Sequence, residues 1–276
     1  MTPQRARQTN KIYPKKYLSQ NFLVNPHFQK KIAESYDLKP TDIVLEIGPG
    51  TGLLTSLIAP HVKHVFAVEK DKQLAVRLNE QYAHSNVTII NADILKYPLH
   101  DLPAPLKVIG NLPYHISTPI VTKIIEAREQ CPSLYITVQL EYGQRLAAQP
   151  GSKDYGALSC FVQYYANTKV LFKIPPTAFN PKPKVQSCFV ECLMRKEPAV
   201  ATQNEELFFK IIRLGFQQRR KMLINALSDL KKKEELIQIL KHCGISQNTR
   251  VESLSLEQFA RLVNLLMENP DEVYGK

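Results

Sequence analysis

The stretch Asp42-Ile43-Val44-Leu45-Glu46-Ile47-Gly48-Pro49-Gly50-Thr51-Gly52 decides the fold. Its apolar, β-branched half predicts a buried strand, and the glycine-rich turn leads into residues 53–58, which read as a helix. Glycine lets a backbone approach a ligand where a Cβ would clash. The three glycines do not have the spacing of the dinucleotide-binding motif, and Pro49 interrupts it. We therefore interpret the turn as a site for a nucleoside with an amino-acid tail rather than for a pyrophosphate.

Acidic side chains follow the next two strands of the predicted sheet. The strand 64–68 ends in Glu69, about 20 residues after the glycines, where a carboxylate can accept hydrogen bonds from both hydroxyls of a ribose. The strand 87–90 is followed by Asp93, whose carboxylate can accept a hydrogen bond from an adenine amine. Either acid alone is more often a surface residue or a helix cap. Their recurrence at successive strand ends predicts one ligand site, because open α/β sheets bind ligands at that edge.

A fourth strand, 107–109, leads into Asn111-Leu112-Pro113-Tyr114. Pro113 cannot continue the strand, so the chain turns and presents the Asn111 amide and the Leu112 carbonyl. Two acceptors followed by an aromatic ring suit a planar base that carries an exocyclic amine. On these residues alone, an ordinary strand-end turn whose tyrosine packs on the core is an equal alternative.

The proline-rich segment 175–184 carries a second aromatic candidate, Phe179. It lies between two strands, 169–174 and 185–194, that we expect to form a terminal pair. The prolines stiffen the segment, and the sequence offers Phe179 no strand or helix that would bury it. We therefore expect its ring to form the second face of a base-stacking clamp. The alternative is that Phe179 packs on the core.

The composition is that of a basic globular chain. Its 276 residues suffice for one large domain and a smaller one, and 44% of them are hydrophobic. The apolar runs are too short to cross a bilayer, and we recognise no secretion signal. The net charge of +11 favours a polyanionic partner. The five cysteines lack metal-ligand spacing, so we expect reduced core thiols in the cytosol and no metal site.

The periodicity divides the chain into three parts. Residues 1–16 form a basic arm, residues 17–197 the α/β domain, and residues 198–276 a helical domain entered through Pro198. In the helical domain, a glycine after Cys243 is expected to end one helix, and a capping box at 255–258 is expected to begin the last.

Two basic clusters are candidates for contact with phosphates. The first is Lys15 and Lys16 in the arm, and the second is Arg219, Arg220 and Lys221 in the helical domain. The alternative for the second cluster is that Arg219 and Arg220 tie the helical domain to the first.

The sequence resembles the rRNA adenine dimethyltransferases, a family of class I S-adenosylmethionine-dependent methyltransferases. The motifs that carry the resemblance are Glu46 to Gly52, Asn111 to Pro119, Ser19 to Leu23, Tyr155 to Ser159, Phe179 to Ser187, and Phe216 to Lys221. They cover nearly the whole chain, which favours the bacterial branch that modifies two adjacent adenines near the 3′ end of small-subunit rRNA. The related large-subunit enzymes of the macrolide-resistance type are the nearest alternative. Ser19, Asn180 and Gln186 depart from the residues usual in the family.

The resemblance implies a Rossmann-like, mostly parallel sheet with an antiparallel terminal strand, followed by a small all-α domain. It implies that S-adenosylmethionine is held by Asn21, Leu23, Gly48, Gly50, Glu69, Asp93 and Asn111. It also implies that the target adenine is held by Asn111, Leu112, Tyr114 and Phe179. The expected protein is a cytoplasmic monomer that acts on the assembling small subunit, with no membrane partner. An alternative from a different functional class is a non-catalytic RNA-binding assembly factor whose pocket is vestigial.

Overall fold

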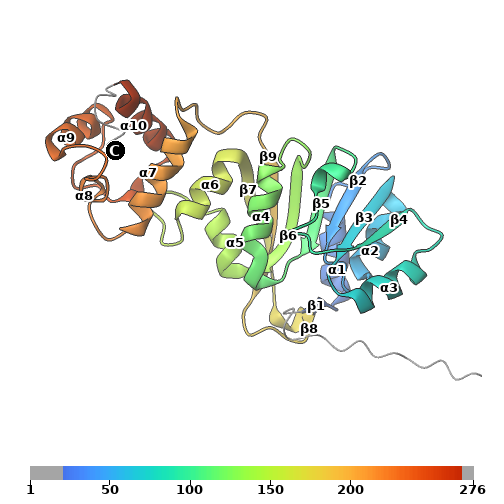
Figure 1. Ribbon diagram of the computed structural model, residues 1–276. Coiled ribbons are helices and arrows are strands. Elements are labelled where there is room, and N and C mark those ends of the chain that lie inside the picture. Colours follow the sequence, from blue (N-terminus) through green and yellow to red (C-terminus); the bar gives the residue numbers. More distant parts are fainter. Residues whose placement is uncertain (1–20, 269–276) are drawn as a thin grey trace, which may run out of the picture.

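The computed structural model describes residues 21–268, and a seven-stranded sheet forms the centre of the larger domain (Figure 1). The strands are β2 (Ile43–Ile47), β3 (His64–Glu69), β4 (Val87–Asn91), β5 (Leu106–Asn111), β6 (Ser133–Gln139), β7 (Ala166–Ile174) and β9 (Ser187–Met194). Their spatial order is β4-β3-β2-β5-β6-β9-β7, and the first five are parallel. β9 runs antiparallel to both β6 and β7, so the antiparallel strand lies beside the edge rather than at it. The predicted fold class is confirmed.

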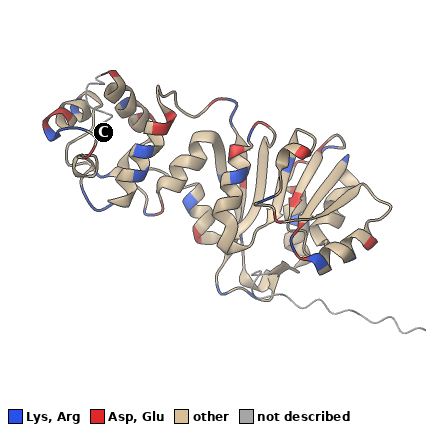
Figure 2. Cartoon of the chain, viewed as in Figure 1, with Lys and Arg blue, Asp and Glu red and all other residues tan. Residues whose placement is uncertain are grey.

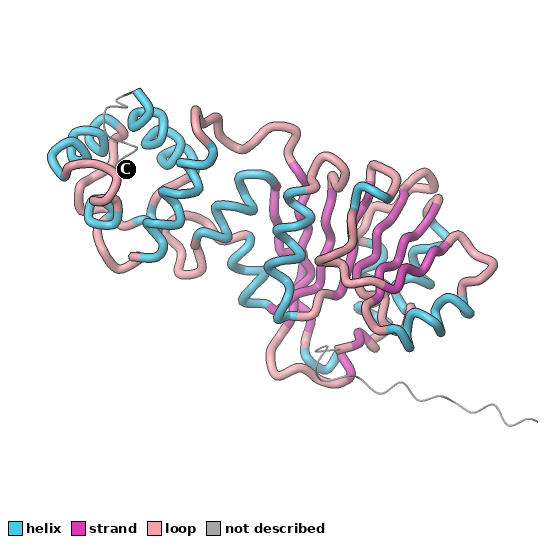
Figure 3. The backbone as a smooth tube through the Cα atoms, viewed as in Figure 1, coloured by secondary structure: helices cyan, strands magenta, loops and turns pink. Residues whose placement is uncertain are grey.

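Helices cover both faces of the sheet (Figure 3). Alternate residues of each strand point to opposite faces, so Val44 and Ile109 belong to one apolar cluster, and Leu45 and Val108 to the other. The first cluster packs under α1 (Pro26–Glu34), α2 (Leu53–Ile58) and α3 (Lys72–Gln81). The second packs under α4 (Ser117–Glu126), α5 (Leu140–Leu146) and α6 (Ala157–Tyr165).

A separate two-stranded sheet joins the start of the described chain to the proline-rich segment. β1 (Phe22–Leu23) pairs antiparallel with β8 (Phe179–Asn180), with Leu23 opposite Phe179. The backbone N–H of Val24 continues the pairing by donating to the carbonyl of Ala178 over 2.8 Å. Strands of two residues have no readable periodicity, so the sequence did not predict this sheet.

Up to residue 268, four α-helices form the C-terminal domain, at the end of the molecule remote from β4 (Figure 1). They are α7 (Glu205–Gln217), α8 (Leu223–Ala226), α9 (Lys233–His242) and α10 (Leu256–Glu268). Gly244 has a φ of 70° just after α9, and the side chains of Ser255 and Gln258 form the predicted capping box. The expected helix ends are therefore confirmed.

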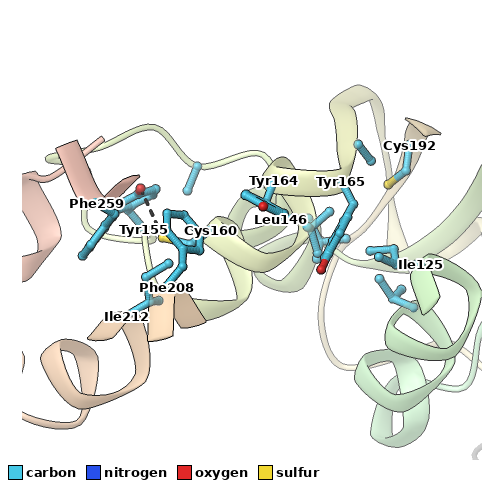
Figure 4. Packing of buried hydrophobic residues seen from close by; sticks show 14 of the residues in the cluster. Ile125, Leu146, Tyr155, Cys160, Tyr164, Tyr165, Cys192, Phe208, Ile212 and Phe259 are labelled. Carbon is cyan, nitrogen blue, oxygen red and sulfur yellow. Dashed lines mark hydrogen bonds between the residues drawn. The ribbon is translucent and has the colours of Figure 1, made fainter. Parts of the chain in front are cut away.

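The two domains share a continuous apolar core. Tyr155 and Cys160 of the first domain pack near Phe208 and Phe259 of the second, and all four are almost fully buried (Figure 4). The Tyr155 hydroxyl donates to the carbonyl of Leu254 over 3.0 Å. The boundary predicted at residues 197 and 198 lies in the loop between β9 and α7.

Two expectations from composition can be compared with the described chain. All five cysteines are buried and unpaired, as expected for core thiols, and burial raises the pKa of the Cys192 thiol to about 12. Between residues 21 and 268, every helix is too short or too polar to cross a membrane.

Candidate active site

A cavity of about 280 Å³ opens at the carboxyl ends of β2, β3 and β5. Its walls include every residue expected to hold a cofactor: Asn21, Leu23, Gly48, Gly50, Glu69, Asp93 and Asn111. Leu112 and Tyr114 of the strand-end motif also line it. The parallel strands therefore bring together, at one edge of the sheet, residues that lie up to ninety positions apart in the sequence.

The glycine turn is held against β3 and covered by β1. The N–H of Gly48 donates to the carbonyl of Val68 over 2.9 Å, and both Gly48 and Gly50 have positive φ values. A Cβ on Gly50 would lie 2.9 Å from Cε1 of Phe22. The turn therefore requires glycine for its conformation and for the close approach of the Phe22 ring.

Glu69 ends β3 with its carboxylate fixed by the main chain. Oε2 accepts a hydrogen bond from the N–H of Gly50 over 3.1 Å, and Oε1 accepts one from the N–H of Asp71 over 2.8 Å. The residue is 5% exposed, and this burial raises the pKa of its carboxyl. Each oxygen retains acceptor capacity for a ligand hydroxyl, because a carboxylate oxygen has more than one lone pair.

Asp93 is paired with a cation at the rim of the cavity. Nζ of Lys70 lies 2.9 Å from Oδ2 of Asp93, and the N–H of Leu95 donates to Oδ1 over 3.0 Å. The hydrogen bond from Lys70 lowers the pKa of Asp93, which keeps the carboxylate ionised. Sequence reasoning missed Lys70, although its position directly after Glu69 at a strand end was a usable signal.

The strand-end motif presents its acceptors to the cavity. The Asn111 amide nitrogen donates to the carbonyl oxygen of Asn21 over 2.9 Å, which leaves its Oδ1 as an acceptor. The N–H of Leu112 donates to the carbonyl of Thr137 over 3.1 Å, and this bond fixes the orientation of the peptide. Among residues 21–268, none donates a hydrogen bond to the Leu112 carbonyl. Asn111 Oδ1 and the Leu112 carbonyl therefore remain acceptors on two residues that line the cavity, and their contact with an amine stays a prediction.

The Tyr114 ring lies in the cavity wall and is anchored at its far end. Its hydroxyl forms a hydrogen bond of 2.7 Å with Oγ of Ser187, the buried first residue of β9. Burial raises the pKa of the half-buried Tyr114, so the phenol stays neutral near neutral pH. The ring is therefore held by both the turn after β5 and the start of β9.

Phe179 is not part of this cavity in the structure. It is 4% exposed and packs with Leu23, Ile32 and Ile174. The expectation that no strand would bury Phe179 was wrong, because pairing of β8 with β1 directs the ring into the core. The sequence also missed Phe22, which lines the cavity one residue before Leu23.

Of the two predicted basic clusters, the structure describes only the second. Lys15 and Lys16 lie outside the described residues. Nε of Arg219 lies 2.5 Å from Oε2 of Glu252, and its Nη2 donates to the carbonyl of Lys153 over 2.8 Å. Arg219 therefore ties the helical domain to a loop of the first domain, which is the structural role left open above.

Arg220 and Lys221 are exposed next to this tie. Figure 2 shows Lys and Arg distributed over both domains, with Asp and Glu among them. Within the described chain, contact with a polyanion at this cluster therefore rests on Arg220 and Lys221 rather than on Arg219.

The doubly covered sheet, the glycine turn and the acids at the strand ends define a class I S-adenosylmethionine-dependent methyltransferase. Residues 13–268 match the family described as ribosomal RNA adenine dimethylase, and the chain belongs to that family.

Curated relatives cover most of the chain. A protein of Alkaliphilus metalliredigens named ribosomal RNA small subunit methyltransferase A is 42% identical over 257 residues, which are 90% of each chain. A protein of the same name from Bacillus cytotoxicus is 39% identical over 96% of this chain and 97% of its own.

Two solved structures are similar over both domains. A dimethyladenosine transferase from Plasmodium falciparum has a TM-score of 0.81 and 24% identity, with 92% of this chain and 100% of that chain covered. The 23S rRNA methyltransferase ErmE has a TM-score of 0.72 and 29% identity, with 88% and 98% covered. The first likeness concerns the fold, and the second adds a detectable sequence relationship.

Proposed function

We propose that the protein transfers methyl groups from S-adenosylmethionine to the exocyclic amines of two adjacent adenines near the 3′ end of small-subunit rRNA. The observation that carries the proposal is that Asn111, Leu112 and Tyr114 line the same cavity as Glu69 and Asp93. Family membership and the names of the curated relatives support the choice of a small-subunit adenine.

The residues of the cavity suit the cofactor. Glu69 would accept hydrogen bonds from ribose hydroxyls and Asp93 from an adenine amine, while the space beside Gly48 is open and would be reduced by a side chain. When bound, S-adenosylmethionine supplies an electrophilic methyl group on a positively charged sulfur. The Phe22 ring packs on Gly50 and forms part of the cavity wall.

The strand-end motif would activate a poor nucleophile. The lone pair of adenine's amine is conjugated into the ring, so the planar amine has little nucleophilic character. Asn111 Oδ1 and the Leu112 carbonyl accept its two hydrogens, which favours a pyramidal amine with a localised lone pair. The face of the Tyr114 ring stabilises the positive charge that develops on nitrogen. The adenine must leave its stack to reach these groups.

The alternative functions receive less support. A vestigial pocket is disfavoured by the ordered set of acceptors at Glu69, Asp93 and Asn111. A large-subunit substrate is disfavoured because the curated relatives that cover nine-tenths of this chain or more are named for the small subunit. We propose that the enzyme acts as a monomer in the cytoplasm on the assembling small subunit.

The test is transfer of labelled methyl from S-adenosylmethionine to unmethylated small subunits, with large subunits as the control substrate. We expect label in dimethyladenosine of the small subunit only. Asn111→Ala should abolish it, whereas Asn167→Ala, at an exposed site on β7, should retain it. Equal labelling of large subunits, or none of either, would refute the proposal.

A further inference from the structure

Glu46 is a buried carboxyl at the cavity that the mechanism above does not use. It lies in β2, is 2% exposed and forms part of the cavity wall. The hydroxyl of Thr55, on α2, donates to its Oε2 over 2.6 Å. A carboxyl removed from water at a ligand cavity is costly to ionise unless a cation or donors compensate.

Within the described residues, no cation compensates the charge of Glu46. The ionisable side chains that influence it are Glu69 from β3, Tyr36 after α1 and Tyr82 after α3. None of the ion pairs among residues 21–268 includes Glu46. The described walls of the cavity therefore hold three acidic residues, of which Asp93 is paired with Lys70 and Glu46 has no cation partner among residues 21–268.

The pKa of the Glu46 carboxyl lies near neutral pH. Burial raises the pKa of Glu46 to about 7, and the nearby Glu69 raises it too, while the hydrogen bond from Thr55 acts in the opposite direction. The pKa values of Tyr36 and Tyr82 are also raised, so both phenols stay neutral in this range. Near pH 7 a neutral carboxyl and a carboxylate therefore coexist at position 46 of the ligand-free protein.

We propose that Glu46 is a cofactor-binding residue that releases a proton when the cation enters, so that the cavity distinguishes S-adenosylmethionine from its demethylated product. This inference rests on the proposed function. S-adenosylmethionine carries one more positive charge than S-adenosylhomocysteine, because methyl transfer leaves a neutral thioether. Coulomb attraction inside the cavity favours ionised Glu46 only while that extra charge is present. After transfer Glu46 takes up a proton again, and the product is held less tightly.

The direction of the pH dependence follows from linkage. The cation lowers the pKa of Glu46 below its value of about 7 in the free protein. Between the two values, binding expels a proton, so affinity rises with pH by at most about tenfold per unit and levels off above the free value. S-adenosylhomocysteine lacks the sulfonium, so its affinity should rise less.

The experiment is titration calorimetry of both ligands between about pH 5.5 and about pH 8.5, in buffers of different ionisation enthalpy to count protons. Both ligands carry an α-amino group that also titrates, so its effect is measured on the free ligands and removed before the ratio of the affinity for S-adenosylmethionine to that for S-adenosylhomocysteine is compared across pH. In the unaltered protein we expect this ratio to increase with pH up to about 7 and then to become constant.

Three variants test whether the pH dependence of the affinity ratio arises from Glu46. Glu46→Gln retains an acceptor for Thr55 and should make the ratio independent of pH. Thr55→Val removes the bond that lowers the pKa, so the rise should move to higher pH, and it carries the test if Glu46→Gln does not fold. Glu80→Gln, at an exposed site on α3, should behave as the unaltered protein.

The outcomes separate this inference from the proposed function. Binding of both ligands with a ratio independent of pH would overturn the role of Glu46 and leave the proposed function standing. A pH-dependent ratio that persists in Glu46→Gln would assign the proton to Glu69 and would also overturn it. Failure of the unaltered protein to bind either ligand at any pH would instead refute the proposed function.

Discussion

The amide nitrogen of Asn111 and the main-chain carbonyl oxygen of Asn21 lie 2.9 Å apart. This hydrogen bond joins the end of β5 to the residue just before β1, so two distant parts of the chain form one wall of the cavity. It also sets the direction of the amide, because the nitrogen that donates to Asn21 cannot face the substrate. The Asn21 carbonyl takes no part in the chemistry, but it fixes the orientation of the acceptor oxygen of Asn111.

Asn111→Ala should lower turnover by about 100-fold or more, since it removes a preorganised partner of the amine. Asn111→Asp retains an acceptor oxygen but loses the donor to Asn21, so we expect an intermediate loss. Single-turnover methylation checks both variants, with calorimetry to measure cofactor affinity separately. Turnover of Asn111→Ala at the unaltered rate would remove Asn111 from the mechanism.

Glu69→Ala should weaken cofactor binding by about 1–3 kcal/mol, the usual size of a lost charge-assisted hydrogen bond. The substitution also frees the N–H groups of Gly50 and Asp71, so thermal unfolding must show that the turn persists. Glu80→Ala is the exposed control on the next helix. An unchanged dissociation constant in folded Glu69→Ala would show that the ribose lies elsewhere.

Phe179→Ala should lower the free energy of unfolding by about 3–5 kcal/mol, because it leaves a cavity in a packed core. Phe179→Leu retains most of the apolar volume and removes only the aromatic face. If the residue is purely structural, this variant should form dimethyladenosine at the unaltered rate. Accumulation of monomethyladenosine, counted by mass spectrometry of digested rRNA, would instead show that the ring moves out to clamp the base for the second transfer.

Arg220→Gln combined with Lys221→Gln should weaken RNA binding in a salt-dependent way. Each lost phosphate contact should flatten the slope of log affinity against log salt concentration by about 0.7–0.9. Arg219→Gln should leave the slope unchanged and lower thermal stability, because its guanidinium holds Glu252 and the Lys153 carbonyl. The opposite pattern would assign the phosphate contact to Arg219.

The sequence predicted the sheet and most of the cavity because those features have strong local signals. Periodic apolar residues identified the parallel strands, and a ligand-type residue at each strand end located the edge where they meet. The cap at Ser255 was equally readable, since a capping side chain bonds to residues within one turn.

The features that the sequence did not predict depend on contacts between distant residues. Phe179 reads as a loop aromatic until β1 pairs with its backbone, and β1 is too short to have a pattern of its own. The bonds that anchor Tyr114 to Ser187 and Asn111 to Asn21 join residues far apart in sequence. No local pattern encodes such pairs, because only the folded sheet brings them together.

The core shared by the two domains limits how the protein can be divided. The side chains of Tyr155, Phe208 and Phe259 are each at most 1% exposed where the domains meet. A protein truncated after residue 197 would present an apolar surface to water and would be prone to aggregate. Chimeras that exchange helical domains between small-subunit and large-subunit enzymes should therefore include the loop and helix from residue 151 to residue 165 with the transplanted helices.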